Sequence, residues 1–525
     1  MSTPQRAPLS TESHELRPIL KSLLPILQAR PDWYVSVAFE KKMSRNYSAN
    51  LQQTQIQLTP QQGVILRIYD GFTLHEQATD QLDTQTLEAT AQAFASRISR
   101  LPTPPTRRIP YRGASWEERL KASLDEEILC QIPPNVSAEV PVHFGIRFER
   151  DPLSVSGEAI LKELQDLVQR CVSLAPQVGL TQGELNYIIC RRQISVEESL
   201  FIDRDVDLSQ TLYRQSLTLV TVSKGERAFL REGGLGGLEA AVLEEGALLG
   251  VLRTLTEILR AEPLVPGRYR LLMSPTIAGV LAHEAFGHAQ EGDTCARGRS
   301  KAWDLHHSNE KVGNSLATIL NNPAIYEVGR HSYGAWGSFF FDDEGWLAQK
   351  QVILQEGRLL APMANLTSAL RLGVPRTANG RRESWSHGIY TRQTNTYFSP
   401  GKSTLQELMN EVKDGFLATH PAGGMEDPKG MGIQVGIQFL KEIKDGKLTG
   451  RTLKGPAGGD IQLTGYTPDV LRSILGKSKI EEEHDGPDVA KHPLNDVGGC
   501  GKYHKEFVYA GCGGTYLLVD SVLLG

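Results

Sequence analysis

The sequence predicts an α+β protein. Mixed N-terminal domains should precede a β-rich C-terminal domain, with a strongly curved antiparallel or barrel-like sheet and a bulged helix. Three observations support this prediction. Helical and strand periodicities alternate through the first half, strand patterns dominate the end, and two histidines between these regions have an unusual spacing. The chain has 525 residues, 40% of them hydrophobic, which is enough for two or three cores.

Two proline-containing segments divide the chain into three expected domains. Residues 101–110 are rich enough in proline to form an extended, stiff linker, and residues 263–267 mark a second boundary. We therefore expect an N-terminal α+β domain at 12–105, a middle α+β domain at 115–262 and a C-terminal β-rich domain at 265–525.

The first two domains are expected to mix helices with strands. Leucine and isoleucine recur at helical spacing over residues 15–28, where Pro25 should kink or end the helix. Residues 34–83 have the pattern of a strand meander, and residues 84–98 that of a second helix. In the middle region, two strands are expected at 185–190 and 217–223, followed by a long helix at 238–260.

The region between these domains and the strand-rich end contains the most informative motif. Residues 283–288 read His-Glu-Ala-Phe-Gly-His, which is HExxxH. Two imidazoles can hold a metal that lowers the pKa of a bound water, and the carboxylate can accept that water's proton. Histidines five residues apart lie about 140° out of phase on a regular α-helix. We therefore predict a π-bulge, with Gly287 tolerating the distortion.

A simpler interpretation of this motif is a buried amphipathic helix whose histidines form hydrogen bonds within the core. A metal site would need a third ligand from elsewhere. The six cysteines form no CxxC pair, which argues against a zinc ribbon or a disulfide framework. Cys500 lies among glycines that permit close approach, and Lys502 would favour its thiolate.

A His/His/Cys set would leave a fourth position open, as in catalytic zinc sites. Chemistry alone leaves other candidates for the third ligand: Cys512, His306, His307, His387, Glu291 and Asp293. The last two are also suited to orient an imidazole from outside the ligand set.

Charge and composition limit the classes of partner and location. The net charge is −5 with both signs dispersed, so we expect no nucleic-acid surface. The N-terminus lacks the pattern of a signal peptide, and no apolar run approaches the length of a membrane span. Scattered cysteines fit a reducing compartment. We therefore expect a soluble cytoplasmic protein without a membrane partner.

Short motifs in the second half resemble those of one known family. In order, they are His-Glu-Ala-Phe-Gly-His-Ala-Gln-Glu-Gly-Asp (283–293), Phe-Asp-Asp-Glu-Gly (341–345), Asn-Gly-Arg-Arg-Glu-Ser (379–384), Thr-Asn-Thr-Tyr (394–397), Pro-Gly-Lys-Ser (400–403), Gly-Gly-Cys-Gly-Lys (498–502) and Val-Asp-Ser (519–521). The series resembles the TldD/PmbA family of metallopeptidases, once called modulators of DNA gyrase. Several motifs in the family's order are a more specific match than a single one.

The resemblance implies a zinc ion held by His283, His288 and Cys500, with Glu284 as the general base of peptide hydrolysis. It also implies a TldD-like catalytic subunit, because PmbA-like partners lack the histidine motif. In the family pattern, a dimer encloses the site in a chamber that admits unfolded or short peptides. The partner here would be a PmbA-like subunit or a second copy of this chain.

Four further residues are expected to bind substrate: Arg381, Arg382, His387 and Tyr397. Cationic donors beside zinc can bind a peptide carboxylate or stabilise an oxyanion, and a tyrosine hydroxyl can also donate to an oxyanion. The alternatives are a surface salt-bridge cluster for the charged residues and a core position for the tyrosine.

The sequence departs from the family pattern at places that border the expected site. Residues 422–428 read Ala-Gly-Gly-Met-Glu-Asp-Pro where the family has a third glycine before an acidic residue, and residues 431–439 form an atypical strand. Residues 477–491 resemble an insertion whose acidic run, 481–485, is expected to be a solvated loop. Residues 503–506 replace a glycine-glutamine turn. These departures concern substrate and partner choice.

Two other functions remain open on the sequence alone. In the first, the chain is a peptide-binding or scaffolding subunit whose structural metal has four protein ligands. In the second, it hydrolyses a non-peptide amide.

Overall fold

The computed structural model describes residues 4–123, 125–308, 310–327, 333–456, 459–480, 498–502 and 507–525. The acidic run at 481–485 and the replaced turn at 503–506 lie outside the described residues. In the first half, the elements are β1 (Gln5–Arg6), α1 (Thr11–Leu27), β2 (Tyr34–Asn50), β3 (Thr54–Tyr69), β4 (Leu74–Thr79), α2 (Thr84–Ser99), α3 (Trp116–Ala122), α4 (Glu126–Leu129), β5 (Val142–Gly145), β6 (Arg147–Phe148), α5 (Gly157–Leu174), β7 (Tyr187–Asp203), β8 (Asp207–Ser223), β9 (Glu226–Leu235) and α6 (Glu245–Arg260).

The second half begins with β10 (Glu262–Pro263), β11 (Gly267–Met273), α7 (Pro275–Ala282), the π-helical turn η4 (His283–Gly287), the 3-10 turn η5 (His288–Gln290), α8 (Gly292–Ala296) and α9 (Lys301–Ser308). It continues with β12 (Ile319–Asn321), β13 (Gln351–Gln355), β14 (Arg358–Leu359), α10 (Leu366–Leu372), β15 (Gly380–Arg381), β16 (Tyr390–Thr391), β17 (Asn395–Phe398) and α11 (Leu405–Val412). The last elements are β18 (Gly415–Asp427), β19 (Gly432–Lys444), β20 (Lys447–Lys454), β21 (Ile461–Tyr466), α12 (Thr467–Arg472), β22 (Ile474–Lys477), β23 (Gly498–Cys500), β24 (Val508–Gly513) and β25 (Leu517–Leu524).

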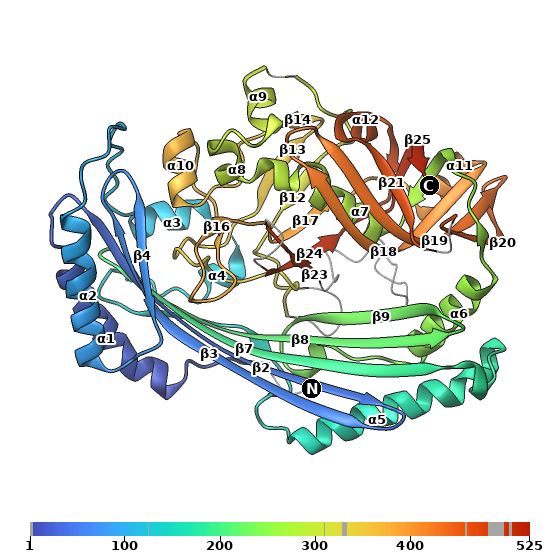
Figure 1. The fold of residues 1–525 in the computed structure, drawn as a ribbon, viewed down its shortest axis with the longest axis horizontal. Helices are drawn as coiled ribbons and strands as arrows, with labels where there is room; N and C mark the ends of the chain where they lie inside the picture. Colours follow the sequence, from blue (N-terminus) through green and yellow to red (C-terminus); the bar gives the residue numbers. More distant parts are fainter. Residues whose placement is uncertain are drawn as a thin grey trace.

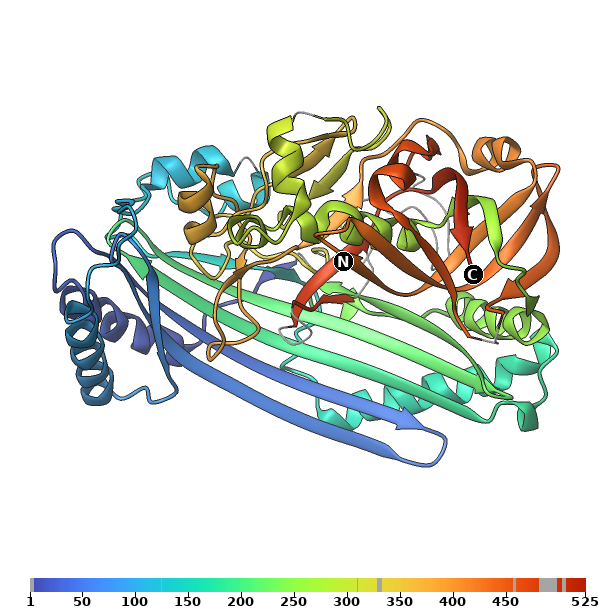
Figure 2. The same ribbon diagram turned by 45° about the horizontal axis from the view of Figure 1, so that its top comes forward.

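A seven-stranded sheet of long strands forms one side of the molecule (Figures 1 and 2). Its order is β4-β3-β2-β7-β8-β5, and β9 also pairs with β8. β2 pairs with β7 from Ser36 to Asn50, so strands from both expected N-terminal domains share this sheet. The expected boundary between the domains at 12–105 and 115–262 stays a prediction.

The two faces of this sheet have different neighbours because side chains alternate along each strand. Val35, Val37 and Phe39 of β2 belong to a buried cluster with the apolar faces of α1 and α2. Farther along β2, Tyr47 and Ala49 join a cluster with α5 and α6. The opposite face of the sheet is turned toward the C-terminal region, as Figure 1 shows.

Five strands of the C-terminal region close into a barrel. β11 pairs with β18 and β25, β25 with β21, β21 with β19, and β19 with β18. All these pairs are antiparallel except β11 with β18. Apolar residues of α7, among them Ile277 and Leu281, share one buried cluster with barrel residues such as Leu271 and Val435. The barrel-like prediction is confirmed.

A six-stranded sheet lies beside α7, with the order β14-β13-β12-β17-β24-β23. Helix α7 approaches β24 so closely that a Cβ on Gly279 would lie 1.8 Å from the backbone nitrogen of Gly513. Only a glycine permits this approach. Since β23 pairs with β24, the contact also brings Cys500 toward the end of α7.

Within the described part of the chain, no helix combines the length and apolar character that a membrane crossing requires.

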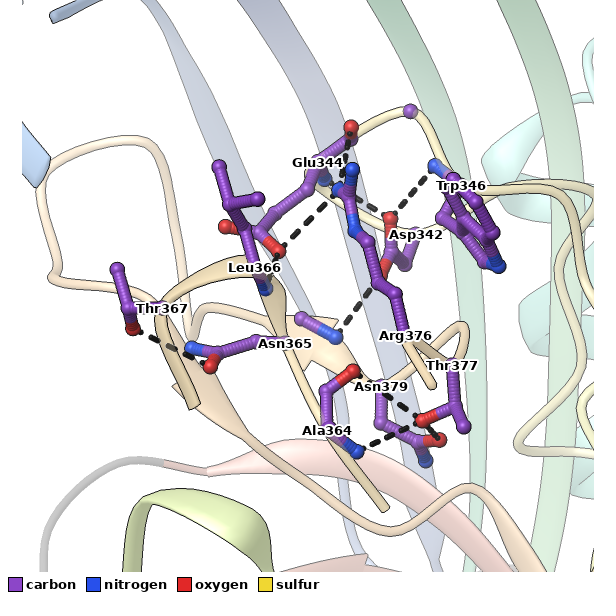
Figure 3. A network of polar contacts seen from close by, with 12 residues as sticks. Asp342, Glu344, Trp346, Ala364, Asn365, Leu366, Thr367, Arg376, Thr377 and Asn379 are labelled. Atoms are coloured by element: carbon purple, nitrogen blue, oxygen red, sulfur yellow. Dashed lines mark hydrogen bonds and ion pairs between the residues drawn. The ribbon is translucent and has the colours of Figure 1, made fainter. Parts of the chain in front are cut away.

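The Phe-Asp-Asp-Glu-Gly motif forms a hydrogen-bonded turn (Figure 3). Asp342 accepts hydrogen bonds from the backbone nitrogens of Glu344 at 3.0 Å and Trp346 at 2.9 Å. Its other oxygen accepts from the backbone nitrogen of Gly380 at 2.8 Å, which fixes the start of the Gly-Arg-Arg segment. Two of the motifs that resemble the family are therefore held together by structural contacts.

Glu344 of the same turn connects the N-terminal sheet to the C-terminal region. Its carboxylate pairs with Arg67 of β3 at 2.6 Å and with Arg376 at 3.3 Å, and it accepts from the backbone nitrogen of Leu366 at 2.6 Å. The Arg67 and Glu344 side chains are each only 1% exposed. This buried carboxylate thus neutralises two arginines from different parts of the chain.

We expect Glu344→Ala to lower the free energy of unfolding by about 3–5 kcal/mol, because Arg376 would lose its salt-bridge partner and buried Arg67 would keep only Glu76. Urea unfolding followed by tryptophan fluorescence would measure the change. Glu117→Ala is the matched control, since the Glu117–Lys121 pair is exposed and should matter little. Equal stability of the Glu344 variant and the wild type would contradict the role given to this turn.

Candidate metal centre

The two motif histidines are brought together by a bulge in their helix. Helix α7 ends at Ala282, and residues 283–287 then form a single π-helical turn before the 3-10 turn at His288. The rings of His283 and His288 lie with their centroids 4.9 Å apart and their planes 86° apart. The predicted π-bulge is confirmed, because a regular helix would have turned these rings apart.

Cys500 completes a three-residue group with the histidines. Its Sγ lies 3.6 Å from His288 Nε2, and the ligand atoms of His283, His288 and Cys500 all lie within 4.8 Å of one another. Ligand atoms of a tetrahedral zinc site are about 3.4–3.7 Å apart, given bond lengths of about 2.0–2.3 Å. The donor types therefore fit zinc, and the 3.6 Å between Cys500 Sγ and His288 Nε2 matches this spacing. Among the described residues, Cys512 is not part of this group.

Without a metal, Cys500 carries a negative charge and His288 a positive one. Burial alone would raise the pKa of Cys500, but the charges of His288, His283 and Arg392 hold it well below its ordinary value. Burial likewise lowers the pKa of His288, yet Cys500 and Glu291 raise it well above its usual range. A thiolate beside an imidazolium results, and metal binding there would release the imidazolium proton.

Lys502 does not have the role that the sequence suggested. Its ammonium pairs with Glu291 at 2.9 Å and with Asp293 at 2.6 Å, and it is 5% exposed. Arg392, which sequence reasoning missed, instead donates to the backbone oxygen of Cys500. The prediction that Lys502 favours the thiolate is corrected: the histidines and Arg392 do so.

Glu291 orients His288, as the sequence analysis expected of a nearby carboxylate. Its Oε1 lies 3.4 Å from His288 Nδ1, which leaves Nε2 to face Cys500. Burial would raise the pKa of Glu291, but Lys502 and His288 lower it to about 2. The carboxylate is thus ionised and fixes which imidazole nitrogen is available to a metal.

We expect Glu291→Gln to weaken zinc affinity by about 10- to 100-fold, because His288 would lose its orienting carboxylate. Competition with a chromogenic chelator would measure the affinity. Asp293→Asn is the matched control, since Asp293 also pairs with Lys502 but, among the described residues, forms no hydrogen bond or ion pair with His288. Equal losses in both variants would show that the effect passes through Lys502 rather than His288.

Glu284 points from the π-turn toward strand β18. Its side chain is 8% exposed, and a Cβ on Gly424 would lie 2.6 Å from Glu284 Cγ. Within the described part of the chain, the Glu284 carboxylate has no hydrogen-bond or salt-bridge partner. A carboxylate next to the ligand group and without a protein partner is suited to accept a proton from water.

Gly287 is needed for space rather than for an unusual backbone conformation. Its φ of −60° and ψ of −64° are open to any residue, which corrects the role predicted for it. A Cβ at this position would lie 2.0 Å from Gln393 Oε1. Gln393 in turn donates to the backbone oxygen of His283 at 3.1 Å. Gln393, which immediately precedes the Thr-Asn-Thr motif, was not identified from the sequence.

The two arginines predicted to bind substrate are both buried and already paired. Arg381 donates to the backbone oxygens of Gln393 at 2.9 Å and Tyr509 at 2.6 Å. Arg382 pairs with Glu76 at 2.8 Å and donates to the backbone oxygen of His387 at 3.0 Å. Burial lowers the pKa of Arg381 to about 10. Their role in substrate binding stays a prediction.

The other two predicted residues lie in different surroundings. The His387 ring faces Ser384 Oγ at 2.8 Å and is 41% exposed. His387, Arg381 and Arg382 line one cavity of about 250 Å³. Tyr397 belongs to a buried cluster with Leu320 and Ile325, and burial raises its pKa to about 12.

The competing histidine pair lies at the end of α9, apart from the ligand group. His306 faces Gln290 at 2.6 Å, and His307 faces the backbone oxygen of Trp303 at 2.7 Å. Neither belongs to a metal-ligand group among the residues that the structure describes.

A polar groove of about 840 Å³ adjoins the strand that carries Cys500. Gly498 and Gly499 line it, together with Trp336 and Tyr509. Amide side chains of the long strands and of the turn between β2 and β3 form much of the rest: Asn46, Asn50, Gln53, Gln55, Gln57 and Gln193. The groove thus offers many hydrogen-bonding groups beside strand β23.

Comparisons with known proteins agree with this geometry. Residues 266–522 match the PmbA/TldA metallopeptidase C-terminal domain. A metalloprotease of Methanocaldococcus jannaschii is 32% identical over 46% of this chain and 51% of its own length. A zinc metalloprotease TldD homolog of Saccharolobus solfataricus is 29% identical over 41% of this chain and 44% of its own length. The chain thus matches about half the length of these relatives.

The likeness to solved structures extends over the whole chain. TldE from Thermococcus kodakarensis superimposes with a TM-score of 0.62 at 15% identity, covering 98% of this chain and 99% of that one. At this identity the likeness concerns the fold. The domain match over residues 266–522 shows that the C-terminal part of this chain is a domain of the TldD/PmbA metallopeptidase family.

Proposed function

We propose that this chain is a zinc-dependent peptide hydrolase whose metal is held by His283, His288 and Cys500. One observation carries the proposal: a π-helical turn places two imidazoles beside a buried thiolate, with Glu284 in the same turn. The name of the Saccharolobus relative, a zinc metalloprotease, supports the choice of metal and reaction. Three protein ligands leave a fourth position for a substrate or water, as in catalytic zinc sites.

Each residue of the centre has a distinct proposed role. A zinc ion bound there would polarise the scissile carbonyl and lower the pKa of a water. Glu284 would accept the proton of the attacking water and pass it to the leaving amine. Glu291 keeps His288 Nε2 directed at the site, and Arg392 together with the histidines favours the thiolate of Cys500.

The proposed substrate is a short or unfolded peptide. β18 pairs with β11 only over Phe416–Ala418, so beside Glu284 one edge of β18 has no strand partner among the described residues. Such an edge can hold an extended peptide backbone through main-chain hydrogen bonds. The polar groove beside β23 offers amide groups that can bind the rest of the substrate peptide.

We also propose that the site works inside a dimer in the cytoplasm. The fold of TldE from Thermococcus kodakarensis supports a PmbA-like or TldE-like partner, and a second copy of this chain is the alternative. No disulfide joins any two of the cysteines in the described part of the chain, which fits a reducing compartment.

Mass spectrometry of unstructured peptides incubated with the zinc-loaded chain tests this function. Fragments should appear with the chain alone or with a PmbA-like partner, and a chelator should abolish them. The absence of cleavage in both preparations, with zinc bound, would contradict the proposal and favour a scaffolding role. Cleavage of small amides but not of peptides would move the substrate to a different class.

A further inference from the structure

We propose that Glu426 is a specificity residue that binds a positively charged group of the substrate beside the scissile bond. The inference rests on the proposed peptidase function and deepens it. Glu426 lies on β18, within the segment where this sequence departs from the family pattern.

The register of β18 directs Glu426 toward the metal centre. From Gly424 to Asp427, β18 pairs regularly with β19, because the bulge lies before Gly424. A Cβ on Gly424 would lie 2.9 Å from Glu284 Oε1, so the face of β18 on which the Gly424 side chain would lie is turned toward Glu284. Glu426, two residues farther on, shares that face. Met425 lies on the opposite face and is 59% exposed.

Most of the charged groups around Glu426 are carboxylates. Burial raises the pKa of Glu426 to about 8, His288 lowers it, and Glu291 and Glu284 raise it. Glu291 is already neutralised by Lys502, whereas Glu426 has no salt-bridge partner among the residues that the structure describes. A carboxylate without a salt-bridge partner in such surroundings favours the binding of a cation beside it.

That cation is better supplied by the substrate than by a second metal. The described metal-ligand group contains His283, His288 and Cys500 and does not extend to Glu426. A substrate held along β18 would instead place its own groups beside Glu426. An ammonium or guanidinium there would pair with the carboxylate, which is then ionised. Glu426 would thereby select among peptides that the polar groove binds equally.

Two sources can supply this positive group: the free amino terminus of a peptide, or a lysine or arginine side chain next to the scissile bond. The first predicts trimming from the amino end, and the second predicts cleavage beside basic residues. In both cases a positively charged nitrogen group would donate hydrogen bonds to the Glu426 carboxylate. Peptides that differ in only one of these groups distinguish the sources.

Binding measured without turnover tests the inference independently of hydrolysis. Fluorescence anisotropy would be recorded with zinc-loaded Glu284→Gln protein and with the same protein carrying Glu426→Gln. The labelled peptides would have a free or acetylated amino terminus, each with lysine or norleucine at one internal position. We expect one cationic group to tighten binding by about 10- to 100-fold, and Glu426→Gln to remove that gain.

Asp427→Asn is the matched control, because Asp427 lies on the opposite face and its Oδ1 accepts from the backbone nitrogen of Lys429 at 3.0 Å. It should leave the preference unchanged. Equal binding of all four peptides, or a preference that survives Glu426→Gln, would overturn the inference. Neither result bears on hydrolysis, whose failure would be seen separately as the absence of fragments in the peptide digest.

Discussion

Replacing Glu284 with glutamine is expected to abolish peptide hydrolysis while leaving zinc bound. Glutamine keeps the size of the side chain and its contact with Gly424, but it cannot accept the proton of the attacking water. General-base catalysis is typically worth about 10²- to 10⁴-fold in rate. Turnover of a quenched fluorescent peptide should fall by about this factor, with zinc content by mass spectrometry unchanged.

The zinc content of the variant is the control measurement. Zinc content equal to that of the wild type shows that the lost activity comes from the carboxylate and not from the ligand set. Wild-type turnover in Glu284→Gln would contradict its role as the base. Loss of zinc would instead make Glu284 a ligand, although it lies outside the group whose atoms are within 4.8 Å of one another.

Cys500→Ser should lose zinc as well as activity. The low pKa of Cys500 makes it a thiolate, whereas a serine hydroxyl stays protonated and binds zinc poorly. Affinity should fall by more than about 100-fold, because even partners outside the ligand set are worth about 10- to 100-fold. Zinc retained after dialysis against a chelator would measure the loss.

Cys512→Ser is the matched control for this second variant. Cys512 has a similar glycine-rich setting in the sequence, but the described ligand group does not include it. Its replacement should leave the zinc content unchanged. A requirement for both cysteines would indicate a four-ligand structural metal and would favour a scaffolding subunit over an enzyme.

The sequence predicted the local features of the site better than its wider surroundings. The five-residue spacing of His283 and His288 requires a bulge if both rings are to meet, and residues 283–287 form one. Glu291 follows His288 by three residues, so its contact with that ring is local as well. Such contacts depend on helix geometry, which sequence spacing determines.

Contacts between distant segments could not be inferred in the same way. Lys502 lies two residues from Cys500, yet it pairs with Glu291 and Asp293 across the fold. Gly287 is explained by the approach of Gln393, which is more than a hundred residues away. Arg382 is paired with Glu76 of the N-terminal sheet. The sequence around a charged residue does not reveal which distant residue will be buried beside it as its partner.

Not every motif that resembles the family belongs to the metal centre. The Phe-Asp-Asp-Glu-Gly turn has no part in the ligand group, and its carboxylates bind backbone nitrogens and arginines. Such a motif is recognisable in the sequence because the fold needs it. Its structural role depends on partners distant in the sequence: Arg67 of β3 and, in the C-terminal half, Leu366 and Arg376, which Figure 3 shows beside Glu344.

The central claim is that two histidines and one cysteine hold a zinc ion with an open position. X-ray absorption at the zinc edge of the loaded protein tests this most directly. We expect one sulfur at about 2.3 Å and two imidazole nitrogens at about 2.0 Å, with a remaining light atom that is not from imidazole. Two sulfurs, or four protein ligands, would contradict the claim and make the metal structural.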